Sequence, residues 1–262
     1  MIFNWLKARR RARILKTPFP SHWNEIVRQS VPQIEVLTGS QQQRLRRRLQ
    51  IFVAEKNWEG CNGLELTEEM RVTIAAMACL LVAGFAEEEY YDHVLSILIY
   101  PDSYVARNTQ VLGTGTVIEG QQARIGEAWY RGPVILSWND ISETARNETF
   151  GRNVVLHEFA HQLDMLNGRA ADGLPMLPSA AHLKQWKAVM QAAYDQLVAA
   201  CRDGQQTLID CYGATSPAEF FAVTTELFFE APTPLRHWHP DVYQQLSRFY
   251  GLDPANWGTS CP

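Results

Sequence analysis

The amino-acid sequence predicts an α+β protein that is mostly helical and carries one small β-sheet. Apolar residues recur at the helical spacing over long stretches in both halves of the 262-residue chain. By contrast, only a few short runs, near the middle of the chain, are typical of strands. We expect a basic and aromatic N-terminal arm at 1–20, a single domain at 21–257 and a short tail at 258–262.

The N-terminal arm combines apolar and basic side chains. A secretory signal would place its positive charge before a longer apolar stretch, so this segment is not typical of one. A basic arm suits a membrane surface or an acidic partner. We favour the alternative, in which its aromatic side chains pack on the domain while its arginines stay in solvent. The apolar residues are Ile2, Phe3, Trp5 and Leu6, and the basic residues are Lys7, Arg9, Arg10, Arg11, Arg13 and Lys16.

Residues 21–86 are expected to be largely helical. In the segment 41–55, leucine and phenylalanine recur at the helical spacing. Thr67 begins a further helix, whose nearly continuous apolar stretch predicts burial, and Gly84 ends it. The arginines of the first helix are expected to form a solvated face. They are Arg44, Arg46, Arg47 and Arg48.

The strands are expected between these helices and in the middle of the chain. Residues 57–63 are rich in turn formers and predict a link, followed by a short strand at 64–66. The compact apolar run at 94–100 ends at a proline and is typical of a strand. Two further strands are expected at 123–129 and 134–138, joined as a hairpin.

Two histidines stand four residues apart in the segment His157-Glu158-Phe159-Ala160-His161. On a helix they lie one above the other, so both imidazoles can reach one ion. Zinc binds neutral imidazoles well, and a catalytic zinc keeps an open position for water beside three protein ligands. Glu158 then points beside the metal, where it can take a proton from that water. The alternative is that two histidines share a helix face by chance.

The surrounding sequence favours a helix at this motif. Apolar residues on another face follow the 3.6 period, and Asn167-Gly168 is a good stop. Metzincins continue the motif with glycine and histidine, whereas Asp164 and Asn167 stand at the matching positions here, so that class is excluded. The apolar residues are Val155, Phe159, Leu163 and Leu166.

A third metal ligand must come from elsewhere in the chain. No glutamate occurs between Glu158 and Glu219, so Glu219 is the first one available. Ser216 and Pro217 before it predict the start of a helix. The same spacing is a capping box, in which Glu219 only bonds back to Ser216, and the residues leave both interpretations open. Asp164 is more typical of a partner that orients a ligand, or of a polar helix end. The other candidate ligands are Asp164, Asp195, His182, Glu226 and Glu230.

The rest of the C-terminal half is expected to alternate helix and loop. Residues 169–179 predict a loop that borders the site, and 182–202 an amphipathic helix. Residues 217–230 form the helix that brings Glu219. His237 and His239 are expected in a polar loop, where we do not expect a second metal site.

Composition excludes several classes of function. A net charge of −4 and a pI of about 6.0 give no sign of direct nucleic-acid binding, and no apolar run approaches a membrane span. Five cysteines without paired spacing predict free thiols in a reducing compartment, which is the cytoplasm. For Cys211, which precedes Tyr212, we favour a buried structural thiol over a place near the metal.

Together these segments carry a resemblance to known zinc peptidases. The histidine motif, Tyr212-Gly213-Ala214-Thr215 and Ala218-Glu219-Phe220-Phe221-Ala222 resemble the protease domain of anthrax lethal factor. Over nearly the whole chain, the sequence resembles the Mlc titration factor A family of bacterial zinc peptidases. The segments that carry this longer match are Trp58-Glu59-Gly60, Ile74-Ala75-Ala76, Ile99-Tyr100-Pro101 and Phe249-Tyr250-Gly251-Leu252-Asp253-Pro254.

The resemblance implies a role for each residue of the site. It assigns one zinc ion to His157, His161 and Glu219, and the catalytic base to Glu158. It implies that Tyr212 stabilises the developing oxyanion. The toxin carries an acid where Val223 stands here, and Glu226 is the candidate replacement for it.

The same resemblance implies a fold and an activity. The fold is zincin-like, with the small sheet over the metal helix, and one of the two predicted strands at 123–129 and 134–138 forms the edge to which a peptide substrate is added. The activity is that of a gluzincin-type zinc metallopeptidase, an aminopeptidase acting on small peptides. The family also binds and inactivates Mlc, a transcriptional repressor of glucose-uptake genes.

A different class of function remains as the alternative. The chain would then be a non-catalytic protein that binds the repressor, with a structural or vestigial zinc site. A structural zinc site is closed by four protein ligands, whereas the residues offer three candidates and a glutamate placed as a base.

Overall fold

The structure is a computed structural model that describes residues 2–86, 90–102, 108–111, 117–120, 132–145, 151–168 and 170–257. Within these ranges, none of the helices combines the length and apolarity needed to cross a membrane. The α-helices are α1 (Ile2–Ile14), α2 (Trp23–Ser30), α3 (Gly39–Glu55), α4 (Glu68–Leu81), α5 (Trp138–Ala145), α6 (Val154–Asp164), α7 (Ala180–Arg202), α8 (Pro217–Glu230), α9 (Pro232–Trp238) and α10 (Pro240–Tyr250). Short 3₁₀ helices are η1 (Pro32–Glu35), η2 (Met165–Asn167), η3 (Cys211–Ala214) and η4 (Pro254–Asn256).

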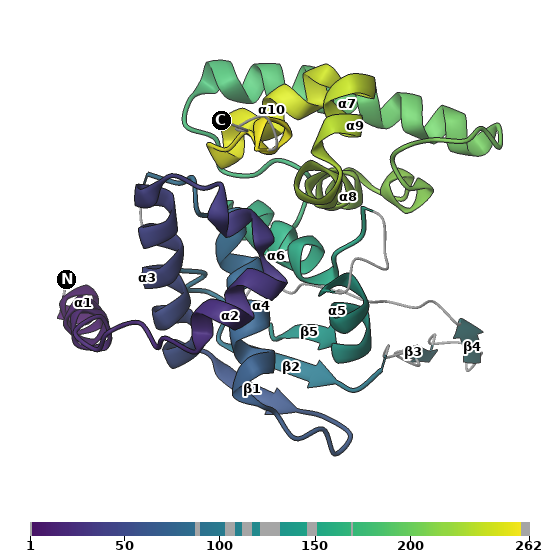
Figure 1. Ribbon diagram of the computed structural model, residues 1–262. Helices are drawn as coiled ribbons and strands as arrows, with labels where there is room; N and C mark the ends of the chain where they lie inside the picture. The colour runs from purple at the N-terminus through teal and green to yellow at the C-terminus, as the bar shows by residue number, and fades with distance from the viewer. Residues whose placement is uncertain are drawn as a thin grey trace.

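The described elements form a mostly helical α+β arrangement, which confirms the predicted fold class at that level. Helix α6 lies at the centre, packed against α4 on one side and α8 on the other (Figure 1). The sheet and helices α2, α4 and α5 lie below α6 in this view, α3 stands to its left, and α7, α9 and α10 lie above α8. The helices expected at 41–55, 182–202 and 217–230 are confirmed as α3, α7 and α8.

The sheet consists of β1 (Asn57–Gly60), β2 (Ser96–Tyr100) and β5 (Val134–Ser137), which run parallel in the order β1-β2-β5. The strands predicted at 94–100 and 134–138 are therefore confirmed. Ile97 and Ile99 of the central strand point to one face of the sheet and are fully buried, whereas the alternate residues of the strand are half-buried on the other face. A separate antiparallel pair, β3 (Asn108–Val111) and β4 (Val117–Gly120), was not predicted. The strand expected at 123–129, and with it the hairpin, lies outside the described residues.

The predicted link at 57–63 is partly wrong, because its first residues form β1. Strand β1 pairs with β2 along its whole length, and a tight turn follows at Asn62 and Gly63, with φ of 51° and 79°. This turn returns the chain so closely that a Cβ at Gly60 would lie 2.0 Å from the carbonyl oxygen of Leu64. Residues 64–66 therefore cover the end of the strand instead of forming one, and the strand predicted there is wrong.

The solvated arginine face predicted on α3 is wrong for Arg48. Its side chain is 3% exposed and donates to the carbonyl oxygens of Val82 and Phe85, the second at 3.1 Å. Arg44 donates to the carbonyl oxygen of Ala83 at 3.1 Å. The last carbonyls of a helix have no partner within it. The two arginines supply donors to the carbonyls of the C-cap and of the turn that follows α4.

The packing predicted for the N-terminal arm is wrong for Trp5 and Arg11, whereas Arg9, Arg10 and Arg13 are exposed as expected. Trp5 and Leu6 of α1 are 59% and 50% exposed, whereas Arg11 is turned inward. Its guanidinium bonds the Glu55 carboxylate at 2.7 Å and also pairs with Asp92. A guanidinium between two carboxylates forms charge-assisted hydrogen bonds, and these fix which face of the short helix meets the domain.

Helices α7, α8 and α10 share an aromatic core. Trp186 of α7, Phe221 of α8 and Phe249 of α10 meet edge to face, with ring centroids 5.6–5.9 Å apart. Each such pair contributes about 0.5–1.5 kcal/mol beyond the area it buries. His237 and His239 lie at the junction of α9 and α10, so the loop predicted there is wrong.

The prediction of free thiols is wrong for Cys201 and Cys211, which form a disulfide. The chain leaves the end of α7 and turns back at η3, which brings their Cα atoms to 5.7 Å, within the usual range for a bridge. Cys211 is exposed and bonded, not a buried structural thiol. Cys61 and Cys79 are free, and Cys261 lies outside the described residues.

Candidate functional site

The histidine motif lies on a helix that is fixed at both ends. Asn153 caps α6, its side-chain oxygen accepting from the backbone N–H groups of Val155 and Leu156 at 3.1 Å. Gly168, at φ 79°, ends the run after η2, where the sequence predicts the stop. Phe159 packs against the rings of Phe52 on α3 and Tyr91 before β2, and it holds the side of the helix opposite the histidines in the core.

Glu219 reaches the same place from the first turn of α8. Ser216 caps this helix and accepts from the backbone N–H of Glu219 at 3.2 Å, with Pro217 as the first helical residue. The Glu219 carboxylate turns toward the histidines of α6: its Oε2 lies 3.0 Å from His157 Nε2 and 3.4 Å from His161 Nε2. Glu219 therefore donates its backbone N–H to the Ser216 cap while its carboxylate faces the two imidazoles.

Three potential ligand atoms converge at this point. The two Nε2 atoms of His157 and His161 are 3.2 Å apart, so all three mutual distances fall between 3.0 and 3.4 Å. Bonds of about 2.0–2.2 Å in a tetrahedron would place zinc ligands roughly 3.3–3.6 Å apart. The buried Glu219 Oε2 also finds no hydrogen-bond donor of suitable geometry among the described residues. The donor set and its spacing fit a metal ion.

Electrostatics favour a cation here. Burial disfavours the charged form of His157, but Glu219 and Glu226 outweigh it and raise its pKa to about 10. Burial likewise works against ionised Glu219, but the imidazoles of His157 and His161 lower its pKa to about 2. The negative charge that favours a proton on His157 also favours a metal ion in its place.

Glu226 of α8 links His157 to the N-terminal end of α6, the helix that carries this histidine. One carboxylate oxygen lies 2.7 Å from His157 Nδ1, and the other accepts from the backbone N–H of Asn153 at 2.6 Å. A carboxylate on the second nitrogen of a metal-binding imidazole fixes the tautomer that leaves the first nitrogen free for the metal. Glu226 therefore lies where a ligand-orienting partner is needed.

Glu158 is buried beside these atoms, 2% exposed. Its Oε1 has no hydrogen-bond partner among the described residues. Burial raises the pKa of this carboxyl above its usual range. An unpartnered buried carboxylate with a raised pKa is suited to accepting a proton.

Tyr212 comes from η3, which Asp210 caps by accepting from the backbone N–H of Tyr212 at 2.9 Å. Its ring centroid lies 6.0 Å from that of His157, and the side chain is 43% exposed. Burial of its hydroxyl side raises the pKa of Tyr212 to about 12. The phenol keeps its proton at neutral pH and can donate it in a hydrogen bond.

Asp164 is directed elsewhere. Its carboxylate accepts from the backbone N–H of Gly173 at 2.7 Å, in the loop that precedes α7. Trp186 donates to the carbonyl oxygen of the same glycine at 2.8 Å. Asp164 thus holds the loop predicted at 169–179 against the end of α6, and the structure shows no hydrogen bond from it to either imidazole.

The other candidate ligands are not brought to the centre. Glu230 accepts from the Asn153 side chain at 2.8 Å, Asp195 accepts from Gln191, and His182 packs near Trp186. Among the described residues, His157, His161 and Glu219 form the group whose ligand atoms all lie within 4.8 Å of one another. Sequence reasoning missed Asn153, although an asparagine directly before an apolar helical run is itself a capping signal.

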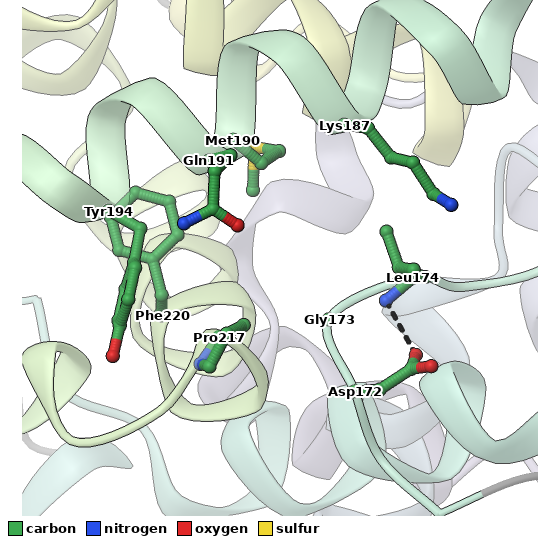
Figure 2. A pocket seen from close by; sticks show the side chains of 9 residues that line it. All are labelled: Asp172, Gly173, Leu174, Lys187, Met190, Gln191, Tyr194, Pro217 and Phe220. Carbon is green, nitrogen blue, oxygen red and sulfur yellow. Dashed lines mark hydrogen bonds between the residues drawn. The ribbon is translucent and has the colours of Figure 1, made fainter.

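A hollow of about 350 Å³ lies on the other side of the first turn of α8. Figure 2 shows its side chains, with Met190 and Tyr194 of α7 facing Pro217 and Phe220 of α8. Lys187 points in from the α7 side toward the loop. Pro217 and Phe220 flank Glu219 in the sequence, but no residue of the metal-facing group lines this hollow.

Comparisons with known proteins identify the family. The family model for the glucose-regulated metallo-peptidase M90 matches residues 5–251. An uncharacterized protein of Synechocystis, slr2042, is 38% identical over 252 residues, covering 96% of this chain and 90% of that protein. The protein named Mlc titration factor A from Serratia proteamaculans is 32% identical, covering 92% of this chain and 94% of that protein. Its namesake from Cronobacter sakazakii is 34% identical, with 86% and 84% covered.

These matches span nearly the whole chain and confirm the resemblance that the sequence motifs indicate. The convergent histidines and glutamate lie inside the matched region. The chain therefore belongs to the glucose-regulated metallo-peptidase M90 family.

Proposed function

We propose that the chain is a zinc-dependent metallopeptidase of gluzincin type, with a zincin-like fold and aminopeptidase activity on small peptides. The observation that carries this proposal is the convergence of His157, His161 and Glu219, with ligand atoms 3.0–3.4 Å apart. Zinc is the metal that a donor set of two imidazoles and a carboxylate suits best, and three protein ligands leave a position for water.

Each residue then has a chemical task. When bound, zinc would polarise the scissile carbonyl and lower the pKa of a water to about 7. Glu158 takes the proton from the attacking water, since its buried Oε1 is without a hydrogen-bond partner in the described chain. Tyr212 donates its hydroxyl hydrogen to the oxyanion that develops on the carbonyl. Glu226 holds the His157 ring from its Nδ1 side.

Strand β5 is the proposed docking edge for a peptide. It is one of the two outer strands of the three-stranded sheet in the described residues, and it packs against α6. An extended peptide can add to such an edge through main-chain hydrogen bonds. The preference for a free amino end comes from the family resemblance, and substrates with free and blocked amino ends test it.

The test combines metal analysis with hydrolysis. The purified chain is expected to hold one zinc and to cleave amino-acid anilides, but not the same anilides with blocked amino ends. Glu158→Gln is the matched control, because it removes the base without removing a ligand. It should keep zinc and lose at least the roughly 10²–10⁴-fold that general-base catalysis contributes. Full activity of this variant at full zinc occupancy contradicts the mechanism.

We also propose that the chain binds the repressor Mlc in the cytoplasm. The support is that relatives 32–34% identical over most of the chain carry the name Mlc titration factor A. Binding without hydrolysis, in both the wild-type chain and Glu158→Gln, would favour the alternative of a non-catalytic repressor-binding protein with a structural zinc.

A further inference from the structure

The disulfide between Cys201 and Cys211 stands directly beside a residue of the proposed catalytic site. Cys201 is in the last turn of α7, and Cys211 begins η3 one residue before Tyr212. The bridge therefore ties the backbone that carries the Tyr212 hydroxyl to the longest helix of the described chain. We propose that this disulfide positions Tyr212 and that its reduction slows the chemical step; the proposal rests on the function inferred above.

The contacts that restrain η3 differ between its N-terminal and C-terminal ends. After Tyr212, Gly213 packs closely between Leu197 and Phe220. Tyr194 of α7 donates to the carbonyl oxygen of Ala214 at 3.2 Å. These contacts fix the C-terminal end of the short helix against α7 and α8 and do not depend on the bridge.

Before Tyr212, the side chain of Ile209 is buried in the core, 1% exposed, and restrains the chain two residues ahead of the bridge. Residues 203–206 are exposed, and Asp210 is held from outside η3 by an ion pair with Arg152 whose side chain is 68% exposed. Exposed ion pairs of this kind contribute little because water and salt screen them. The bridge at Cys211 adds a covalent cross-link to α7 between the buried Ile209 and Tyr212.

The bridge is also reachable. Cys211 is exposed and Cys201 is half-buried, so a dithiol in solution can approach the Cys211 sulfur. A thiolate of the dithiol attacks Cys211 Sγ, the sulfur–sulfur bond breaks, and Cys201 Sγ leaves with the electron pair and takes up a proton. The second thiolate of the dithiol then attacks the dithiol sulfur that is bonded to Cys211. Cys211 Sγ leaves and takes up a proton, so two electrons have passed from the dithiol to the bridge.

The contrast with the other described cysteines supports a specific role. Cys79 is buried, and burial raises the pKa of its thiol to about 12, so it is inert to exchange. Cys61 is half-buried and free, and it lies just after β1, outside both α7 and η3. Replacement of Cys61 therefore makes a matched control that leaves the bridge in place.

The experiment measures kcat and KM of the zinc-loaded full chain before and after dithiothreitol, with differential alkylation to report the fraction of the bridge reduced. Reduction is expected to lower kcat roughly tenfold and to change KM less than twofold, because a displaced donor acts in the transition state. Cys61→Ser should respond as the wild-type chain does. The double variant Cys201→Ser/Cys211→Ser should show the reduced kcat without dithiol and no further loss with it. Dithiols also bind zinc. Because the double variant has no bridge to reduce, any loss of kcat that dithiol causes in it measures removal of the metal.

A cycle with Tyr212→Phe tests whether the bridge acts through the tyrosine. In that background, dithiol is expected to leave kcat unchanged, since the donor is already absent. A tenfold loss in Tyr212→Phe as well, or an unchanged wild-type kcat with the bridge reduced, overturns the proposal.

A second readout does not depend on activity. Hydrogen exchange of the peptide covering 210–215 should speed up on reduction, while that of α8 stays as before. Unchanged exchange in this peptide also overturns the proposal. An oxidised chain that holds zinc but hydrolyses nothing contradicts the proposed function instead, and the exchange measurement then decides whether the bridge orders η3.

Discussion

At the scale of single residues, Glu219 has two contacts, one typical of a helix start and one typical of a metal ligand. Its backbone N–H binds the Ser216 hydroxyl, while its carboxylate lies at the two imidazoles. The two contacts use different atoms of one residue. Variants of Glu219 and Ser216 can therefore remove one contact and keep the other.

We expect Glu219→Gln to lose zinc, because two imidazoles alone are a poor site for the ion. Ser216→Ala is the matched control. It should keep full zinc stoichiometry and lose about 1 kcal/mol of unfolding free energy, the usual contribution of an N-cap. Zinc content by mass spectrometry and urea unfolding measure the two effects. A Glu219→Gln chain that holds zinc as the wild type does would mean that Glu219 is only a cap.

The proposed role of Tyr212 depends on a single group, its hydroxyl. Tyr212→Phe removes the hydroxyl and keeps the ring 6.0 Å from His157. Steady-state kinetics should show kcat reduced by roughly 10²-fold, the order found when an oxyanion donor is removed, with KM nearly unchanged. If kcat is unchanged, Tyr212 packs against the imidazole and takes no part in the chemistry.

At the scale of elements, the site depends on how α6 and α8 pack. Each helix supplies part of the ligand set, and Glu226 of α8 holds both His157 and the capped N-terminus of α6. Glu230, one turn later on α8, binds only the Asn153 side chain. The two glutamates thus join the same helices but touch the metal-facing group differently.

Glu226→Gln should weaken zinc affinity by about 10–100-fold, as loss of a ligand-orienting partner does. Glu230→Gln, which breaks a contact between the same two helices, should leave zinc affinity within twofold of the wild type. Competition with a chelator of known affinity measures both. Equal losses in the two variants would show that helix packing, not orientation of His157, controls the site.

At the scale of the whole molecule, the proposed repressor contact needs a large exposed surface, which the candidate metal site does not offer. The centre is buried between α6 and α8, whereas a standard interface needs about 800 Å² of accessible surface per partner. Helix α1 presents Trp5 and Leu6 to solvent, while Arg11 holds it on the domain. The outer face of α1 is therefore a more suitable contact surface.

We predict that Glu158→Gln binds Mlc with near wild-type affinity. Removal of residues 1–16, or the milder Trp5→Ser/Leu6→Ser, should weaken binding, because interface aromatics contribute most of the binding energy. Trp238→Ser, at a tryptophan on α9 that is at least as exposed as Trp5, is the control and should not change the affinity. Titration of purified Mlc decides the question. Loss of binding in Glu158→Gln, with binding retained by the truncated chain, would place the repressor in the active site.

Much of the fold could be predicted because it depends on local sequence. The helical period at 182–202 and the Ser216-Pro217 start of α8 act within one or two turns, and the structure has helices at both places. The run at 94–100 yielded β2 for the same reason. The link at 57–63 failed as a prediction because strand β1 exists only through its pairing with β2, a partner nearly forty residues away.

The sequence by itself determined the pair of histidines and the glutamate between them. Their common place on one helix follows from the spacing of four residues and the apolar positions around them. Only the tertiary structure decided that the Glu219 carboxylate faces them, that Glu226 holds His157, that Cys201 meets Cys211 and that Arg48 is buried. Each of these contacts joins segments that are distant along the chain or meet across a turn. Local periodicity carries no information on such meetings, because packing of the whole core sets them.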